Sequence, residues 1–423
     1  MNKLNSAGRA CAVLALCAAT AITLHAQTFG VLHSFDLTDG SMPLAGLIQG
    51  TDGSLYGTTQ LGGANLYGTV FKITPTGTLT TLYSFCSQSG CTDGDYPYAS
   101  LVQGTDGNFY GTTANGGANG GGTVFKITPT GTLTTLYSFC PVTGCADGYA
   151  PLAGLVQGTD GNFYGTASSG GTNGYSGTIF KFTPTGTLTT LYSFCSQTRC
   201  TDGVYPYAEL VRGTDGNFYG TTAYGGANGD YGTVFKVTPT GTLTTLYSFC
   251  SQSGCTDGQE PRGLIRGTDG NFYGTTAKDY GTVFKITPAG TLTTLYSFCS
   301  QSSCADGSYP EGGLVQDTNG RLYGTTSQGG ASGRGTVFTL SMGLQAFVET
   351  QPSFGKVGIR VKILGTNLTG ATSVTFNGVP ATFTVFSYSL IGTTVPAGAT
   401  TGTVQVTTPS GVLSSNVPFR VTQ

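Results

Sequence analysis

The cysteines offer the most definite chemistry in this sequence of 423 residues, because ten of the 12 cysteines form five pairs with the spacing Cys-x4-Cys. In an oxidising compartment such pairs form disulfides, although two thiolates could also be half of a zinc site. No loop has a second pair, and His33, the only histidine after residue 26, belongs to a segment without cysteines. The sequence therefore predicts no metal site and five disulfides: Cys86–Cys91, Cys140–Cys145, Cys195–Cys200, Cys250–Cys255 and Cys299–Cys304.

Aspartates and lysines recur in rows with the same period. A calcium site needs several oxygen ligands within one loop, whereas each loop here has one carboxylate, so we expect the aspartates to form turns. The lysines alternate with Phe and Ile, which favours a solvated strand face over the alternative, a ring of anion ligands. The rows are Asp52, Asp106, Asp160, Asp215 and Asp269; Asp39, Asp93, Asp147, Asp202, Asp257 and Asp306; and Lys72, Lys126, Lys181, Lys236 and Lys285.

Tyrosines follow the cysteine pairs on loops that the disulfides would hold rigid. A tyrosine on a rigid loop offers apolar area and a hydroxyl at little entropic cost, so these loops are candidates for ligand contact. The alternative is that the rings fill gaps between structural units. The candidate binding residues are Tyr96, Tyr98, Tyr149, Tyr205, Tyr207 and Tyr309.

No catalytic constellation is visible in the sequence. With one histidine after residue 26 and no Gly-x-Ser-x-Gly motif, a Ser–His–Asp triad is improbable. A glycosidase-type pair of carboxylates stays open, because any two turn aspartates could converge in space. We therefore predict no catalytic residue and no cofactor.

The elements that carry these residues form a repeat. Tyr-Gly-Thr recurs at intervals of 50 to 55 residues, starting at Tyr56, Tyr110, Tyr164, Tyr219, Tyr273 and Tyr323. In the second unit, residues 101–103, 109–113, 123–128 and 132–139 are predicted strands, separated by Asp-Gly and Pro-x-Gly turns that favour hairpins. Four strands in each of several units are typical of a β-propeller.

The number of strands predicts how the ring closes. The first three strands occur six times, but the fourth occurs only five times after its own third strand. Residues 29–35 match the fourth strand and precede the first unit, so we expect them to complete the sixth unit and cover its open edge. The predicted fold class is all-β: a six-bladed β-propeller closed by the N-terminal strand, followed by an immunoglobulin-like β-sandwich.

Composition and the two ends of the chain set the context. Charged residues are 9% of the chain and the formal charge is −2, which gives no basic footprint for nucleic acid. Residues 1–26 carry Lys3, Arg9 and then an apolar run to Leu24, as a cleaved signal peptide does. We expect residues 27–342 to form the propeller and residues 343–423 a second domain, in a monomeric, exported chain without a membrane span after cleavage.

Two family resemblances add to this interpretation. Residues 29–340 resemble the Gloeo/Verruco tandem repeats of exported bacterial proteins through the recurring LYSF, DGNFYGTT and GTVFKITPTG motifs; the resemblance implies export but supplies no catalytic residue. The tail resembles an IPT/TIG domain, which implies a spacer or adhesion module. The tail motifs are Pro352-Ser353, Gly355, Ile363-Leu364-Gly365-Thr366-Asn367-Leu368, Val374-Thr375-Phe376-Asn377-Gly378 and Val395-Pro396-Ala397-Gly398.

These observations favour a secreted or surface-attached, non-enzymatic protein that binds an extracellular polysaccharide or protein through one face of the propeller. Six nearly uniform units without a chemically distinct one are the main reason. The alternative is a carbohydrate-acting hydrolase or lyase with carboxylates at the propeller channel.

Overall fold

The computed structural model describes residues 33–422, except residues 51, 53, 75, 105, 142, 332 and 334. The predicted signal peptide and most of the predicted closing strand lie outside the described residues. Strands and four short 3-10 turns make up the regular structure of the described chain, so the all-β prediction is confirmed. No helix in this part of the chain is long and apolar enough to span a membrane.

Each repeat folds into its own antiparallel sheet, whose strands lie in sequence order. Repeat sheets 1 to 3 are β1 (Ile48–Gln49), β2 (Leu55–Thr59), β3 (Thr69–Ile73), β4 (Leu79–Ser84); β5 (Val102–Gln103), β6 (Phe109–Thr113), β7 (Thr123–Ile127), β8 (Leu133–Ser138); and β9 (Val156–Gln157), β10 (Phe163–Ala167), β11 (Thr178–Phe182), β12 (Leu188–Ser193). Repeat sheets 4 to 6 are β13 (Val211–Arg212), β14 (Phe218–Thr222), β15 (Thr233–Val237), β16 (Leu243–Ser248); β17 (Pro261–Arg266), β18 (Phe272–Thr276), β19 (Thr282–Ile286), β20 (Leu292–Ser297); and β21 (Val315–Gln316), β22 (Leu322–Thr326), β23 (Thr336–Leu340).

The Tyr-Gly-Thr motif is explained by close packing inside each sheet. Gly111 of β6 lies under the ring of Phe125, the residue opposite it on β7. A Cβ atom at Gly111 would lie 2.6 Å from that ring, so only glycine leaves room for the phenylalanine. The same pair recurs in the other repeats, for example Gly165 with Phe180 at 2.7 Å.

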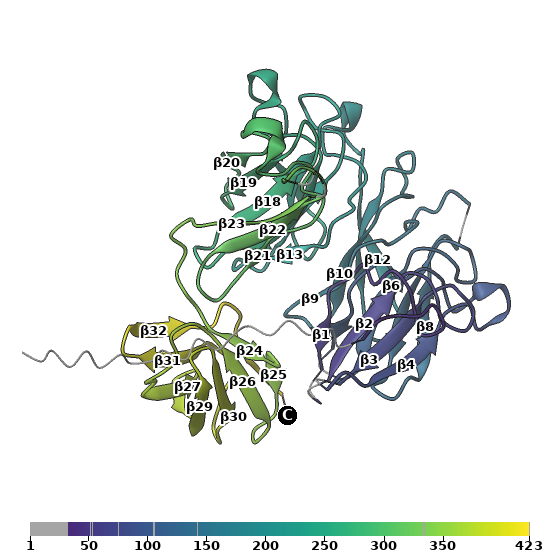
Figure 1. Cartoon of the computed structure of the whole chain (residues 1–423). Helices are drawn as coiled ribbons and strands as arrows, with labels where there is room; N and C mark the ends of the chain where they lie inside the picture. The colour runs from purple at the N-terminus through teal and green to yellow at the C-terminus, as the bar shows by residue number, and fades with distance from the viewer. Residues whose placement is uncertain are drawn as a thin grey trace, which may run out of the picture.

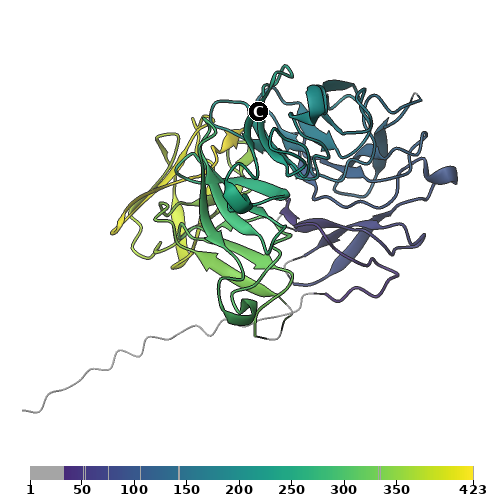
Figure 2. The same cartoon turned by 90° about the horizontal axis from the view of Figure 1, so that it is seen from above.

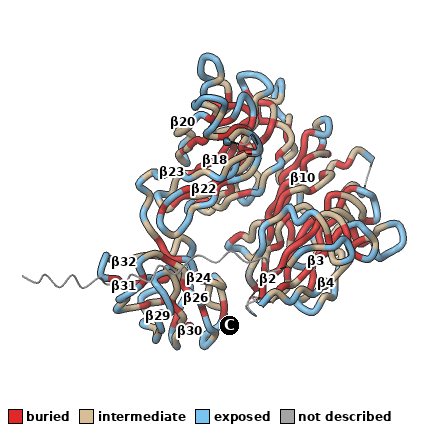
Figure 3. Tube along the Cα trace, viewed as in Figure 1, coloured by how far each residue is buried: buried red, intermediate tan, exposed pale blue. Residues whose placement is uncertain are grey.

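Successive sheets pack face to face through aromatic residues. Tyr56 of sheet 1 stacks on Phe109 of sheet 2 with ring centroids 4.0 Å apart, and Phe85 meets Phe125 edge-on at 5.2 Å. Each pair of consecutive sheets encloses a buried cluster of this kind, visible as the buried strand segments in Figure 3. The result is a propeller-like array of repeat sheets (Figures 1 and 2).

In sheets 4 to 6 the chain at the first strand lies next to the equivalent segments of the neighbouring repeats. A Cβ atom at Gly263 in sheet 5 would lie 4.0 Å from Ala208 of sheet 4 and 4.0 Å from Gly313 of sheet 6. In Figure 1 the labels of β1, β9, β13 and β21 accordingly lie toward the middle of the array, with β4, β8 and β20 at its periphery.

The sixth sheet has three strands among the described residues, as the strand count predicted. Its third strand is open, because Val337 is 79% exposed whereas the equivalent Val124 is fully buried. A groove of about 340 Å³ runs along it, lined by Val337, Phe338 and Leu340 together with Phe298 of the preceding sheet. The predicted pairing of residues 31 and 32 with this strand lies outside the described residues.

The tail forms two further four-stranded sheets that share one apolar core. The first has the order β24 (Glu349–Gln351), β26 (Arg360–Leu364), β30 (Leu390–Thr394), β29 (Phe383–Ser387), and the second β28 (Val379–Pro380), β27 (Ser373–Phe376), β31 (Val404–Thr408), β32 (Gly411–Ser414). Val361 and Ile391 of the first sheet face Phe376 and Val404 of the second across this core. A short parallel pair, β25 (Phe354–Gly355) with β33 (Arg420–Val421), completes a two-layered β-structure.

Candidate functional site

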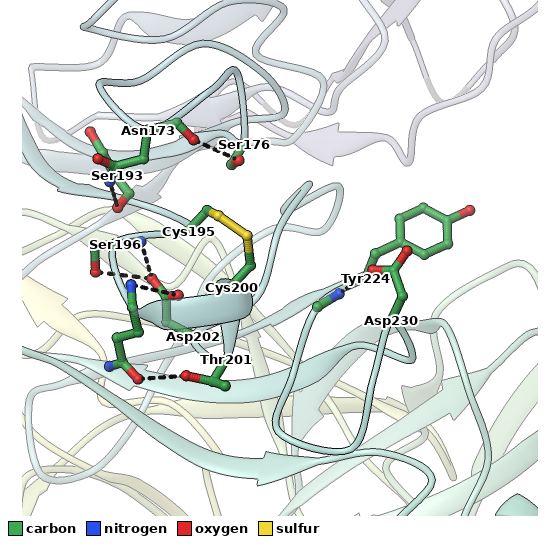
Figure 4. The surroundings of a disulfide bond; sticks show 12 residues. Asn173, Ser176, Ser193, Cys195, Ser196, Cys200, Thr201, Asp202, Tyr224 and Asp230 are labelled. Atoms are coloured by element: carbon green, nitrogen blue, oxygen red, sulfur yellow. Dashed lines mark hydrogen bonds between the residues drawn. A yellow bond between two sulfur atoms is a disulfide. The ribbon is translucent and has the colours of Figure 1, made fainter.

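The five predicted disulfides are all present. In four of the loops the second cysteine ends a short 3-10 turn: η1 (Ser89–Cys91), η2 (Thr198–Cys200), η3 (Ser253–Cys255) and η4 (Ser302–Cys304). Around Cys195–Cys200 (Figure 4), the buried carboxylate of Asp202 accepts hydrogen bonds from the backbone N–H groups of Ser196 at 2.9 Å and Gln197 at 3.3 Å. The same carboxylate also accepts a hydrogen bond from the Tyr192 hydroxyl at 2.8 Å. This aspartate row therefore organises the disulfide loops.

The other aspartate row fastens the hairpins. Asp160 accepts a hydrogen bond from the Tyr164 hydroxyl at 3.0 Å and forms an ion pair with Lys181 at 2.9 Å. Although desolvation opposes it, hydrogen bonds from Asn162, Lys181 and Tyr164 lower the pKa of Asp160 to about 2. The lysine row accordingly supplies ion pairs to this turn in three repeats, through Lys72, Lys181 and Lys285.

The candidate binding tyrosines form separate small groups. Tyr96 lies against Tyr67, with ring centroids 5.5 Å apart, and Tyr98 accepts a hydrogen bond from the Gln60 amide. Tyr309 lies 6.0 Å from Tyr280. Tyr149 forms a backbone bridge with Ser169 and is half-buried.

Tyr205 and Tyr207 form the group most open to a ligand. Their rings are nearly parallel, at 7° with centroids 6.1 Å apart, and Tyr224 stands perpendicular to Tyr205 at 6.1 Å. Tyr207 is 41% exposed. Burial, followed by the neighbouring Tyr224 and Tyr205 hydroxyls, raises the pKa of Tyr207, against the charge of Arg262. Figure 4 shows Tyr224 near the Cys195–Cys200 loop.

Charged residues of the next two repeats complete this group. Repeat 5 reads Pro261-Arg262-Gly263-Leu264 where repeat 4 reads Pro206-Tyr207-Ala208-Glu209-Leu210, so one residue is missing and an arginine enters. Arg262 pairs with Glu311 of repeat 6 at 2.8 Å and with Glu260 at 3.8 Å. Its Nε atom is buried without a hydrogen-bond partner in the described part of the chain.

We name this set the aromatic and charged cluster: Tyr205, Tyr207, Tyr224, Glu260, Arg262 and Glu311. Sequence reasoning found Tyr205 and Tyr207 but missed the other four residues. It treated the six repeats as nearly uniform and so did not examine where repeat 5 departs from the others. An alignment of the six repeats that asked where a charge replaces a neutral residue would have found Glu260 and Arg262.

The same comparison reveals a carboxyl just before the first strand of repeat 4. Glu209 occupies a position held by glycine or serine in the other repeats: Gly46, Ser100, Gly154, Gly263 and Gly313. Its side chain reaches solvent, yet its Oε2 atom would lie 2.9 Å from a Cβ atom at Gly154 of the neighbouring sheet. Desolvation there raises the pKa of Glu209 to about 7.

Comparison with known proteins gives one family match. The family model of the Gloeobacter/Verrucomicrobia repeat matches residues 18–212 and again residues 196–386. No curated protein matches the chain.

Among solved structures, the chain is similar to an auxiliary nutrient binding protein from Bacteroides thetaiotaomicron. The two are 14% identical, the match covers 71% of this chain and 69% of that chain, and the TM-score is 0.43. The PQQ-bound aldose sugar dehydrogenase from Streptomyces coelicolor is 14% identical, with a match that covers 73% of this chain and 96% of that chain at a TM-score of 0.41. Regucalcin from Agrobacterium tumefaciens is 12% identical, with a match that covers 72% of this chain and 92% of that chain at a TM-score of 0.36.

Proposed function

The chain belongs to the Gloeobacter/Verrucomicrobia repeat family, and on that premise we propose that it is an exported, non-enzymatic binding protein whose ligand contacts the aromatic and charged cluster. Five disulfides support export, because such bonds persist in oxidising compartments. The charged N-terminal residues followed by an apolar run supply the matching export signal.

The observation that carries the proposal is the nearly parallel pair of the half-buried Tyr205 and the exposed Tyr207 beside Arg262. Two tyrosine rings with nearly parallel planes offer a rigid apolar surface with hydroxyl groups at its edge. Arg262, Glu260 and Glu311 add donors and acceptors within the same cluster. A saccharide, with apolar ring faces and hydroxyl edges, fits these two kinds of group best.

The repeat itself supplies a matched control. Tyr98 follows Pro97 in repeat 2 as Tyr207 follows Pro206 in repeat 4. Tyr98, however, accepts a hydrogen bond from Gln60, and the repeat after it has Leu152 where repeat 5 has Arg262. On a glycan array we expect Tyr207→Ala to weaken binding of the bound glycan at least tenfold and Tyr98→Ala to leave it unchanged. An equal loss of glycan affinity in both variants would contradict the saccharide site. So would a wild-type protein that binds a protein partner but no glycan.

A second candidate, a carbohydrate-acting hydrolase or lyase, is favoured by one observation: Glu209, whose pKa of about 7 suits a general acid. Such an enzyme needs a second carboxylate about 5–10 Å away. Glu260 and Glu311, the nearest candidates by sequence position on neighbouring repeats, are engaged by Arg262. A hydrolysis screen of wild type against Glu209→Gln decides this: loss of a measurable activity in the variant would establish the enzyme.

We also propose that the six repeat sheets close into a ring through the N-terminal strand. Phe35 meets Phe71 of sheet 1 at 5.1 Å and 69°, as Phe85, which directly follows β4, meets Phe125 of sheet 2 at 5.2 Å and 64°. His33 bonds to Asp39 at 2.6 Å, where Tyr83 bonds to Asp93 in the next repeat. Residues 33–35 thus stand toward sheet 1 as a fourth strand does toward the sheet that follows it.

For the tail we propose an IPT/TIG-like module that acts as a spacer or adhesion domain. The two-sheet arrangement and the hairpin turn at Asn377-Gly378, with Asn377 at φ 47°, support it. A fragment of residues 343–423 that folds alone, followed by circular dichroism on heating, is the direct test.

A further inference from the structure

Three arginines gather where the tail meets the first strands of the repeats. Arg212 ends β13, Arg266 ends β17 and Arg420 begins β33. The first strands β13 and β17 contact each other, and Arg420 reaches a third one, β9, by donating from Nη2 to Gln157 Oε1 at 3.0 Å. All three side chains are half-buried.

Two of these arginines interrupt the repeat. The position of Arg212 and Arg266 is glutamine in the other four repeats: Gln49, Gln103, Gln157 and Gln316. Glutamine satisfies the fold there, so the arginines are not needed to form the strand. Their introduction in two adjacent repeats adds two positive charges to one place.

The charge of the cluster is not neutralised within the described chain. Arg266 donates to the backbone carbonyl of Asn416 at 2.8 Å and Arg420 to a neutral amide, while Arg212 has no hydrogen bond or ion pair to any described residue. The ion pairs of the described chain all involve other cations. Burial, and then the charge of Arg212, lowers the pKa of both Arg266 and Arg420, so Arg212 lies within electrostatic reach of each.

Space for a ligand adjoins the cluster. A cavity of about 410 Å³ opens between sheet 5 and the tail, and Arg266, Thr268, Ser415 and Asn416 line it. Its wall therefore combines a guanidinium group with hydroxyl and amide groups. Guanidinium groups bind carboxylate, sulfate and phosphate oxygens with two parallel hydrogen bonds.

We propose that Arg212, Arg266 and Arg420 form an oxyanion-binding site between the repeat array and the tail, for a carboxylate, sulfate or phosphate group. An oxyanion supplies the negative charge that the described residues do not, and it holds three structural parts together. This site lies at the opposite end of the first strands from the aromatic and charged cluster, and it does not depend on the function proposed there.

The test uses the full exported chain with its disulfides intact. Thermal unfolding and isothermal titration are measured with sodium sulfate against sodium chloride at equal ionic strength. Arg212→Gln, and Arg212→Gln with Arg266→Gln, restore the residue that four repeats carry, so we expect both to fold; Arg199→Gln, on an exposed disulfide loop, is the control.

We expect sulfate to raise the melting temperature of wild type and Arg199→Gln, and the double variant to lose at least tenfold in sulfate affinity. Arg212→Gln, which breaks no hydrogen bond in the described chain, should lose at least threefold. An equal response to sulfate and chloride in wild type, or unchanged sulfate affinity in Arg212→Gln, would overturn the site. A sulfated oligosaccharide that binds more tightly than sulfate, beside a neutral one that does not bind, assigns the anion to a glycan; equal affinity for sulfate assigns it to the free ion.

Discussion

Replacing Phe35 by alanine measures how firmly the N-terminal segment closes the repeat array. Truncation of a fully buried phenylalanine to alanine lowers the free energy of unfolding by about 3–5 kcal/mol. An edge-on aromatic pair contributes about 0.5–1.5 kcal/mol to stability beyond the effect of its buried area. Phe35 is half-buried among the described residues and has the Phe71 contact at 5.1 Å, so these contacts alone predict a loss of about 1–2 kcal/mol. If residues 29–35 also pair with β23, the Phe35 side chain is buried on both sides, and the loss in the free energy of unfolding rises to about 3 kcal/mol.

Urea unfolding followed by circular dichroism gives this free energy, and Phe85→Ala is the matched control, since Phe85 is fully buried in the equivalent place. We expect Phe35→Ala to reach at least half of the Phe85→Ala loss. Deletion of residues 28–32 keeps Phe35 but removes the proposed partner of β23, and should speed hydrogen exchange of the β23 amides. A Phe35→Ala loss below about 0.5 kcal/mol, within the range of surface substitutions, would refute closure by this strand.

Three further outcomes follow from other sites. Because the folded pKa of Glu209 is about 7 and thus above the ordinary 4.5, the folded state loses stability as pH rises from 4.5 to 7; Glu209→Gln should match wild type at pH 4.5 but exceed it at pH 8 by about 1 kcal/mol after solvent screening, or about 2 °C in melting temperature. Asp257→Asn should cost about 2 kcal/mol in urea unfolding, because a buried charged acceptor of the Tyr247 hydroxyl and two backbone N–H groups is lost; an unchanged midpoint would contradict this role. Gly165→Ala should cost about 1–3 kcal/mol by crowding Phe180, and a neutral result would mean that this ring moves freely.

Much of the repeat array could be predicted from the sequence because each local signal occurs five or six times. The Asp-Gly and Pro-x-Gly turns fixed the hairpins, and the strand at 109–113 lies where it was predicted. The disulfides followed from the Cys-x4-Cys spacing, the expected export, and the lack of further zinc ligands in each loop. The missing fourth strand of the sixth sheet was also visible as a missing motif.

The tail was harder because its strands are not repeated. The alternation in residues 373–376 is typical of a strand, and β27 lies there, whereas Leu-Ile-Gly-Thr-Thr of β30 (Leu390–Thr394) lacks strict alternation. β30 is the strand that joins β26 to β29 at the centre of its sheet. Its burial, and not its own sequence pattern, determines its conformation.

The charged residues of the two proposed sites were missed for the opposite reason, because the six repeats look nearly uniform. In an array whose stability comes from repeated contacts between neighbouring sheets, a residue that differs from its equivalents is free of that shared structural demand. Such residues are Arg212 on the first strand of repeat 4, Glu209 just before that strand, and Arg262 and Arg266 on the first strand of repeat 5, which is the adjacent repeat. Tyr98 and Tyr207 make the same point, because equivalent tyrosines have different partners in repeats 2 and 4. Ligand specificity in this chain is therefore expected to reside in and just before the first strands of repeats 4 and 5. An exchange of residues 204–212 for the equivalent residues 149–157, which includes Tyr205→Ala, Tyr207→Leu and Arg212→Gln, should weaken binding at both proposed sites while preserving the fold.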